Sequence, residues 1–383
     1  MKIFSYTYNY AHKTMTFLTN ELKCVDTEHE LLFAYSNRLN PELYQLKAMV
    51  QIPYKFNRVN TKIRWLLEKY EISFPLRNFT FKKKLNKTIS DFKPDIIHCH
   101  FGTDFLKVMG NLNEEHRHIP FLVSFYGFDV TERIKNKAVL KKYIQFFNKP
   151  NIHSIAVSES LIKNINDHIK PYNKAILLHS GIDVDFFRRK ESPKNSGEFI
   201  FLQVSYFNQK KGYYYTLKAF RKFIDENNDC NYKFKIVGFG PLENSIKDQI
   251  KELALENHVT MLPPVSPQEM VELSSNVDCF VQMSITADNG DQEGLPNVLL
   301  EAMSLELPIL STVHAGIPEI VAHRVNGILC AEKNIEEYVK GFKEISKWKK
   351  CPHNREKIIN LFSFQAHMKH LNEIYKSIQE KKT

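Results

Sequence analysis

Short apolar runs alternate with helical patterns along almost the whole chain, and this alternation constrains the fold more than any other feature. Runs such as "PDIIHCHF" (94–101), "PFLVSFY" (120–126) and "FIFLQVSYF" (199–207) are nearly continuous in apolar residues. Such runs are typical of strands buried on both faces of a parallel sheet, with the intervening helices covering those faces. The sequence therefore predicts an α/β protein built from Rossmann-like domains.

The alternation is interrupted by the polar segment "RRKESPKNSGE" (188–198), whose Pro and Gly are typical of a linker. A chain of 383 residues is also long enough for two domains. We predict a first domain over residues 1–187, a second over 199–360, and a helical segment over 361–383. The strand ends of the two domains are expected to face a shared cleft, because ligands bind at that edge of open α/β sheets.

Composition excludes several other classes of protein. A hydrophobic content of 43% with 25% charged residues is typical of a folded globular chain. No stretch approaches the roughly 18–20 consecutive apolar residues that span a bilayer, and the start "MKIFSYTYNYAHK" lacks the features of a signal peptide. The six cysteines occur singly, which argues against a zinc site and a disulfide framework. A reducing cytoplasm is the expected location.

Positive charge is concentrated in the first half of the chain. Residues 1–190 hold 30 Lys and Arg against 18 Asp and Glu, a net +12, whereas residues 191–383 carry a net −2. The excess gathers in "FKKKLNK" (81–87), "RIKNKAVLKKYIQFFNK" (133–149) and "KIRWLLEKY" (62–70). A basic domain joined to a near-neutral one suggests a polyanionic partner.

The partner is not expected to be nucleic acid, because no zinc-finger, RRM or other nucleic-acid signature is present. An anionic membrane surface fits the charge, since each nearby Lys or Arg contributes about 1 kcal/mol there. Trp65, Phe79, Phe81 and Phe146 lie among the lysines and are expected to sit at such an interface. A solvated, lysine-rich surface without a partner is the alternative.

The stretch "DNGDQEGLPNVLLEAM" (288–303) passes from a polar loop into a helix and carries two acids, Glu293 and Glu301, eight residues apart. Taken alone, the pair has a simple interpretation. Glu293 would complement the positive end of the helix dipole, and Glu301 would be a solvated surface acid.

The neighbouring motifs change that interpretation. "VSYFNQKKG" (204–212), "KIVGFGPLE" (235–243) and "EGLPNVLLEAMSLELPILSTVHAGIPEIV" (293–321) occur in the order found in the donor half of glycosyltransferase family 4. They resemble that family's V-G-R-x-x-x-K-K-G, L-x-I-x-G-x-G-P and E-x7-E segments. An E-x7-E spacing alone is a weak signal, whereas the ordered combination is specific.

The first half is similar to one branch of this family. "KTMTFLTNEL" (13–22), "HCHFG" (98–102) and "SFYGFD" (124–129) resemble segments of capsule and exopolysaccharide transferases of the colanic-acid and amylovoran type. The resemblance implies the GT-B fold, in which two Rossmann-like domains face a central cleft and the C-terminal helix crosses back to the N-terminal domain. The first domain would bind the acceptor and the second the donor.

The resemblance also implies roles for individual residues in the second half. Glu301 would accept hydrogen bonds from the ribose hydroxyls of the nucleotide, and Glu293 would lie near the donor sugar and the reacting face. The helix start would hold the diphosphate. Lys211 would bind the phosphates, with Lys210 as the alternative lysine. The donor-binding candidates are Glu301, Lys211, Tyr206, Gly294, Leu295, Asn297 and Val298.

Two candidate positions depart from the family pattern. Tyr206 stands where the family usually has Arg, which removes a fixed positive charge from the leaving group. Tyr126 stands where the family more often has a His that contacts the donor sugar; a phenol donates a hydrogen bond but is not a cation near neutral pH. Tyr206 could itself contact a phosphate, or an arginine from elsewhere could replace the family residue.

Glu293, Tyr126, His100 and Asp129 form the set of candidate catalytic residues. Asp129 matches the family type, with a helix N-cap for "VTERIKNK" as the alternative role. His100, at a strand end, is either a substrate contact or a structural histidine. No metal is expected, since the resemblance implies metal-independent transfer, and Asp288 and Asp291 are interpreted as loop acids.

The resemblance implies a retaining glycosyltransferase that moves a hexose from a nucleotide-diphosphate sugar, expected to be a UDP-sugar, onto a lipid-diphosphate-linked oligosaccharide. The enzyme would work on the inner face of a bacterial cytoplasmic membrane, as a peripheral protein in surface polysaccharide synthesis. It would need no cofactor beyond the sugar nucleotide as co-substrate. A GT-B UDP-sugar epimerase and a non-catalytic sugar-nucleotide binding module are the alternatives.

Overall fold

The computed structural model describes residues 1–383 apart from 12–14, 41–44, 55–77, 191–196, 228–230 and 382–383. The chain divides into two compact units: a first unit of Met1–His179 with His367–Thr383, and a second unit of Ser180–Ala366. The division lies before residue 180 rather than at the predicted 187. Ile182 explains the difference, because its backbone N–H donates to Phe362 (2.8 Å) and its carbonyl accepts from Phe364 (3.0 Å), so this segment belongs to the second unit.

The first unit is built around a parallel sheet, as the apolar runs predicted. In the described residues the sheet has seven strands in the order β3-β2-β1-β4-β5-β6-β7. All of its strand pairs are parallel. The strands are β1 (Lys2–Tyr10), β2 (Glu30–Arg38), β3 (Met49–Gln51), β4 (Ile96–His100), β5 (Phe121–Phe125), β6 (Ile152–Ala156) and β7 (Ile176–Leu177).

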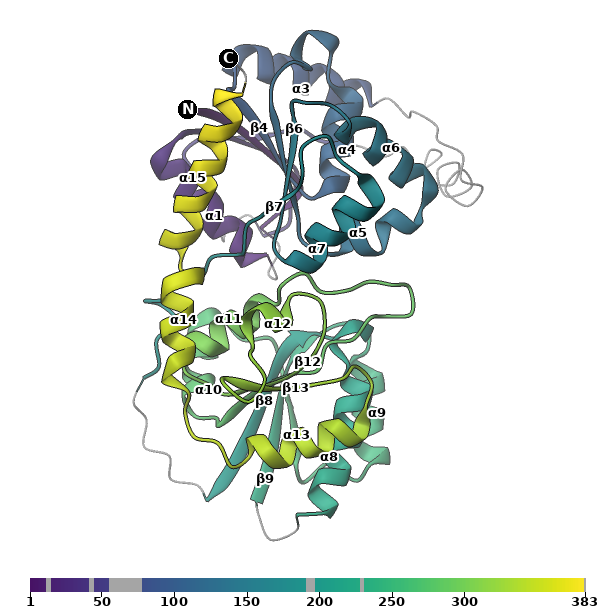
Figure 1. Cartoon of the computed structure of the whole chain (residues 1–383), viewed down its shortest axis with the longest axis vertical. Helices are drawn as coiled ribbons and strands as arrows, with labels where there is room; N and C mark the ends of the chain where they lie inside the picture. Colours follow the sequence, from purple (N-terminus) through teal and green to yellow (C-terminus); the bar gives the residue numbers. More distant parts are fainter. Residues whose placement is uncertain (12–14, 41–44, 55–77, 191–196, 228–230, 382–383) are drawn as a thin grey trace. The chain divides into compact units, whose positions relative to one another are not determined.

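Helices cover this sheet and bury its strands. Every residue of β4, β5 and β6 is buried, which explains their nearly continuous apolar sequences. The α-helices described in this unit are α1 (Thr16–Glu28), α3 (Phe79–Phe92), α4 (Gly102–Asn111), α5 (Phe128–Thr131), α6 (Lys137–Phe147), α7 (Glu159–Asn164) and α15 (Phe364–Glu380). Leu371, Tyr375 and Ile378 of α15 belong to the same hydrophobic cluster as Leu18 and Leu22 of α1. Figure 1 shows α15 running beside α1.

The second unit repeats this architecture with a six-stranded parallel sheet in its described residues, ordered β10-β9-β8-β11-β12-β13. The strands are β8 (Glu198–Tyr206), β9 (Asn231–Phe239), β10 (Val259–Leu262), β11 (Cys279–Gln282), β12 (Ile309–Thr312) and β13 (Gly327–Cys330). The helices are α8 (Tyr213–Asp225), α9 (Glu243–Glu252), α10 (Pro267–Ser275), α11 (Asn297–Ser304), α12 (Ile317–Ile320), α13 (Ile335–Ile345) and α14 (Pro352–Phe362) (Figure 1).

The strand order of the second unit determines where its loops gather. Chain order reverses between β8 and β11, and ligands of open parallel sheets bind at the carboxyl edge near such a point. The segment after β8 lies close to the end of β11 because Gly212 has a φ of +69° and no side chain there. A Cβ at this position would lie 1.9 Å from the carbonyl oxygen of Met283, so the approach requires glycine.

The basic segments of the first unit lie partly on α3 and α6. Phe79 is 78% exposed at the start of α3, with exposed Lys83, Lys84 and Lys87 on the same helix. The prediction for Phe81 was wrong: it is fully buried, because it packs edge-on against Tyr6 with ring centroids 5.7 Å apart. The segment 62–70, with Trp65, lies outside the described residues.

Candidate active site

The candidate donor site of the second unit is formed by segments that follow β8, β11, β12 and β13. Lys210 and Lys211 follow β8, and the loop 283–296 leads from β11 into α11. His314 follows β12, and Glu332 follows β13. The carboxyl ends of parallel strands meet at one edge of a sheet, so residues far apart in the sequence come together there.

Glu293 is a buried carboxylate held by two lysines. Its Oε1 lies 2.5 Å from Nζ of Lys211, and its Oε2 lies 3.8 Å from Nζ of Lys210. Burial alone would raise the pKa of Glu293, but the two ammonium groups outweigh it and lower the pKa to about 2. The sequence left open which lysine serves the site, and the structure places both at Glu293.

Lys210 also pairs with a second acid of the loop. Its Nζ lies 3.1 Å from Oδ2 of Asp291. Asp288 is bound elsewhere: its Oδ2 accepts from Nε2 of Gln209 at 2.5 Å, and its backbone N–H donates back to the same side chain. Asp288 and Asp291 therefore have separate partners among the described residues.

Glu301 on α11 differs from Glu293 in having no opposite charge. No hydrogen bond or ion pair to its carboxyl group is made by the residues that the structure describes. Burial raises its pKa to about 8, because a carboxylate removed from water without a cation favours its protonated form. A ligand that donates hydrogen bonds to this carboxylate would stabilise its ionised form and offset the free-energy cost of burying the charge.

The start of α11 offers further unused polar groups. Pro296 is the N-cap and makes no side-chain cap, so the amides of Asn297 and Val298 in the first turn have no intrahelical acceptor. Among the described residues, the buried Oδ1 atom of Asn297 has no hydrogen-bond partner. The carbonyl oxygen of Gly294 accepts a hydrogen bond from the backbone N–H of Gly316 at 3.0 Å. Leu295 is buried beside it.

Tyr206 is placed at the end of β8 and is 40% exposed. Its ring packs edge-on against Phe239, with centroids 5.1 Å apart. The structure gives this tyrosine an accessible position at the carboxyl edge of the sheet.

His314 and Glu332 were missed by the sequence analysis. His314 is buried, and its Nε2 accepts the backbone N–H of Glu293 at 3.1 Å. Its Nδ1 lies 2.6 Å from Oε1 of Glu332. Each of these two residues comes two positions after an apolar strand, and that spacing was the available signal.

In the first unit, the candidates His100, Tyr126 and Asp129 are neighbours near the ends of β4 and β5. His100 is fully buried; its Nδ1 lies 3.1 Å from the Tyr126 hydroxyl and its Nε2 lies 2.9 Å from Ser5 Oγ. Tyr126 is partly exposed. Any influence of His100 on a ligand would therefore pass through Tyr126.

Asp129 is a fully buried residue with structural hydrogen bonds. Its carboxylate accepts from the backbone N–H groups of Gly102 (2.9 Å), Gly127 (3.2 Å) and Tyr126 (3.3 Å). Burial nevertheless raises its pKa to about 6. The N-cap alternative was wrong in detail, because Gly127 is the cap and Asp129 lies inside α5.

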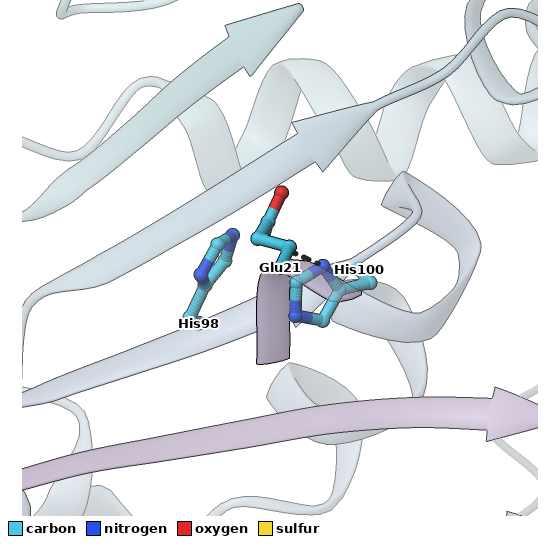
Figure 2. A group of neighbouring side chains, drawn as sticks. All are labelled: Glu21, His98 and His100. Atoms are coloured by element: carbon cyan, nitrogen blue, oxygen red, sulfur yellow. Dashed lines mark ion pairs between the residues drawn. The ribbon is translucent and has the colours of Figure 1, made fainter. Parts of the chain in front are cut away.

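His100 also belongs to a buried cluster with Glu21 and His98, which Figure 2 shows. Glu21 Oε1 is 3.8 Å from His100 Nδ1. The carboxylate and imidazole atoms that could bind a metal ion lie within 4.8 Å of one another. Both ring nitrogens of His98 are already 2.7 Å from hydroxyl groups, those of Tyr375 and Ser124. Both ring nitrogens of His98 are thus engaged by hydroxyl groups, which disfavours a metal site at this cluster.

Two parallel-sheet, Rossmann-like units are the architecture of the GT-B class of glycosyltransferases, and solved structures of this fold resemble the chain. HepE from Anabaena, solved in complex with UDP and glucose, has a TM-score of 0.75 at 16% identity over 98% of this chain and 100% of that one. Sucrose-phosphate synthase from Thermosynechococcus elongatus also has a TM-score of 0.75, at 13% identity over 99% of both chains. These likenesses concern the fold.

The family models for "Glycosyltransferase Family 4" and "Glycosyl transferases group 1" match residues 24–186 and 184–360. The chain is thus made up of a Glycosyltransferase Family 4 domain followed by a Glycosyl transferases group 1 domain.

Two curated relatives come from exopolysaccharide synthesis. The putative colanic acid biosynthesis glycosyltransferase WcaL of Escherichia coli is 25% identical over 67% of this chain and 63% of its own length. The amylovoran biosynthesis glycosyltransferase AmsK of Erwinia amylovora is 28% identical over 63% of this chain and 58% of its own. The chain thus spans less than two thirds of either relative. Within the described residues, no helix has both the length and the apolar character that crossing a membrane requires.

Proposed function

We propose that the protein is a retaining hexosyltransferase that uses a nucleotide-diphosphate sugar, with UDP-sugars as the donor class. The observation that carries the proposal is the contrast between the two acids of the E-x7-E stretch. Glu293 is ionised and paired with Lys211. Glu301 has a raised pKa and no partner within the described chain.

The difference between Glu293 and Glu301 suits two separate roles in binding one sugar nucleotide. Glu301 would accept the two ribose hydroxyls, because a carboxylate has enough acceptor positions for a vicinal diol. The first-turn amides of α11 and the ammonium of Lys211 would hold the diphosphate and its leaving-group charge. Such preorganised donors contribute several kcal/mol of transition-state stabilisation in other enzymes. HepE, a structure with the same fold, was solved with UDP-glucose, which supports UDP as the first nucleotide to test.

We further propose that the acceptor is a lipid-diphosphate-linked oligosaccharide of a bacterial surface polysaccharide, and that transfer needs no metal. The two relatives named for colanic acid and amylovoran synthesis support the polysaccharide class. The net charge of +12 carried by residues 1–190 supports an anionic acceptor and an anionic membrane surface near the first unit. The protein would then act peripherally at the inner face of the cytoplasmic membrane.

The test is release of nucleotide diphosphate from a panel of sugar nucleotides, with the anomeric configuration of the released or transferred sugar read by NMR. Slow hydrolysis of one donor with retained configuration is the expected result. Interconversion of sugars without release would indicate an epimerase, and binding without either reaction would indicate a binding module.

Glu293→Gln should lower turnover while sparing UDP affinity, and Asp288→Asn on the same loop provides the matched control with near-normal turnover. Equal losses of turnover and affinity in Glu293→Gln would contradict the assigned roles.

A further inference from the structure

The loop that carries Glu293 is supported by a buried histidine from another strand end. The backbone N–H of Glu293 donates to Nε2 of His314 at 3.1 Å. An N–H group can only donate, so Nε2 must be the unprotonated nitrogen of the ring. The proton then lies on Nδ1, which is 2.6 Å from the carboxylate of Glu332. The network thus assigns one neutral tautomer to His314.

Glu332 holds the other end of the same loop. Its Oε2 accepts the backbone N–H of Thr286 at 2.7 Å. The Thr286 hydroxyl in turn accepts from Nε2 of Gln292 at 3.1 Å. Glu332 therefore binds residue 286 directly and residue 293 through His314, which fixes both ends of the segment between them.

The loop needs such support because little of its backbone is bonded internally. Ala287 donates to the carbonyl of Asp291 at 3.0 Å, and Gly290 donates to Ala287 at 2.8 Å with a φ of +84°. Neither bond reaches Glu293. Its carboxylate must nevertheless stay against Lys211, and displacement of a catalytic group by about 1 Å can cost 10²-fold in rate.

We propose that His314 and Glu332 are positioning residues of the donor site, which hold the loop 286–293 so that the Glu293 carboxylate faces the donor sugar. This inference rests on the function proposed above. Neither residue needs to contact the substrate. The hydrogen-bonded chain Glu332–His314–Glu293 acts on the backbone of Glu293 and leaves its carboxylate free for Lys211 and the ligand.

The test compares His314→Ala with His314→Gln, whose carboxamide supplies one acceptor for the Glu293 N–H and one donor for Glu332. We expect His314→Ala to lower kcat of donor hydrolysis by about 10²-fold, while the Kd for UDP changes less than about threefold. His314→Gln should recover most of the lost kcat. Glu332→Ala should behave like His314→Ala, since it removes the carboxylate that accepts hydrogen bonds from His314 and from the backbone of Thr286.

His323→Ala is the matched control. His323 is an exposed histidine of the same unit whose Nδ1 also accepts a backbone N–H, that of Leu329 at 3.1 Å. Its loss should leave kcat near that of the wild type. Unchanged kcat in His314→Ala, or equal losses in His314→Ala and His314→Gln, would overturn the proposal.

Hydrogen exchange provides a readout that does not depend on activity. In His314→Ala, peptides covering residues 284–296 should lose protection while peptides from β8 and α8 keep theirs. Unchanged protection of the loop would overturn the proposal even if activity fell. Absence of donor hydrolysis in the wild type, with the loop deprotected in the variant, would instead contradict the proposed function alone.

Discussion

Glu21 and His367 lie 346 residues apart in the chain and form an ion pair inside the first unit, with Nε2 of the imidazole 3.1 Å from Oε2 of the carboxylate. The Nδ1 atom of His367 lies 2.7 Å from the carbonyl oxygen of His179. A carbonyl and a carboxylate can only accept hydrogen bonds, so the doubly protonated ring satisfies both. The pair thereby fastens α15 to α1 within this unit.

The pKa values of the two groups are shifted in opposite directions. Burial opposes both charges, but the hydrogen bond and charge of His367 lower the pKa of Glu21 to about 2, and Glu21 raises the pKa of His367 above its usual 6.5. The contribution of Glu21 to the free energy of unfolding is fully present above its unfolded pKa of 4.5 and is lost as the pH falls toward 2. The contribution of His367 is present below 6.5 and is lost as pH rises through its folded pKa.

The unfolding free energy should therefore exceed that of the double variant Glu21→Gln/His367→Gln by the largest amount between about pH 4.5 and 6.5. The difference should shrink on both sides of this window, as measured by chemical denaturation. His367→Ala alone should cost about 3–5 kcal/mol, because it leaves a buried carboxylate without its partner. A difference that does not vary with pH would show that the pair is not ionised.

The ion pair of Glu21 and His367 was harder to predict from the sequence than the candidate donor site. Lys211, Glu293 and Glu301 were predicted because each lies in a short motif with a fixed spacing. Glu21 and His367 were missed, although a helical segment over residues 361–383 was predicted. Their partnership depends on α15 packing against α1, and no local pattern encodes which buried face of one helix meets the other.

The sheets were more predictable than the interior networks. The parallel strands follow from continuous apolar runs, which have the same physical cause in both units. The burial of Phe81 was not predicted because an aromatic residue among lysines suits either side of an amphipathic helix. The contacts with Tyr6 and Tyr54 decide between them.

Glu301 should control nucleotide affinity in a pH-dependent way. Its pKa of about 8 means that the carboxyl group of the free protein is largely protonated at pH 7, whereas ribose hydroxyls donate best to the ionised form. UDP affinity should therefore rise from about pH 6.5 to pH 9 in the wild type, relative to Glu301→Gln, in isothermal titration. The variant serves as the control, because the phosphate groups of UDP titrate equally in both experiments.

Glu301→Ala should weaken UDP binding by about 1.5–3 kcal/mol, the range for hydrogen bonds to a charged group. Unchanged affinity for every nucleoside diphosphate tested would rule out the ribose assignment.

Tyr206 provides a test of how the leaving-group charge is balanced. If its hydroxyl contacts a phosphate, Tyr206→Phe should weaken the donor complex by about 0.5–1.5 kcal/mol, the usual net value of one hydrogen bond. Tyr206→Arg should be tolerated or should raise turnover, because an exposed position at the end of β8 has room for a guanidinium group. Donor Kd and kcat would both be measured. If neither substitution changes them, another residue neutralises the phosphate.

The basic face of α3 should bind anionic membranes. Phe79 is 78% exposed and lines a surface hollow together with Lys82, Lys83, Lys87 and Glu115. Each lysine near an anionic surface contributes about 1 kcal/mol, so Lys82→Gln/Lys83→Gln/Lys84→Gln should lower binding to anionic vesicles by about 10²-fold. Co-sedimentation at low salt would measure this, with donor hydrolysis unchanged.

The attraction should also disappear with salt, because the Debye length falls from about 8 Å at physiological ionic strength to about 3 Å at 1 M. The matched control is Lys347→Gln/Lys349→Gln/Lys350→Gln, which removes three exposed lysines from the second unit. This control should bind vesicles like the wild type if the first unit makes the contact. Equal loss in both triple variants would show that only net charge matters. Equal binding of the wild type to neutral and anionic vesicles would leave the lysines of α3 with no role beyond solubility.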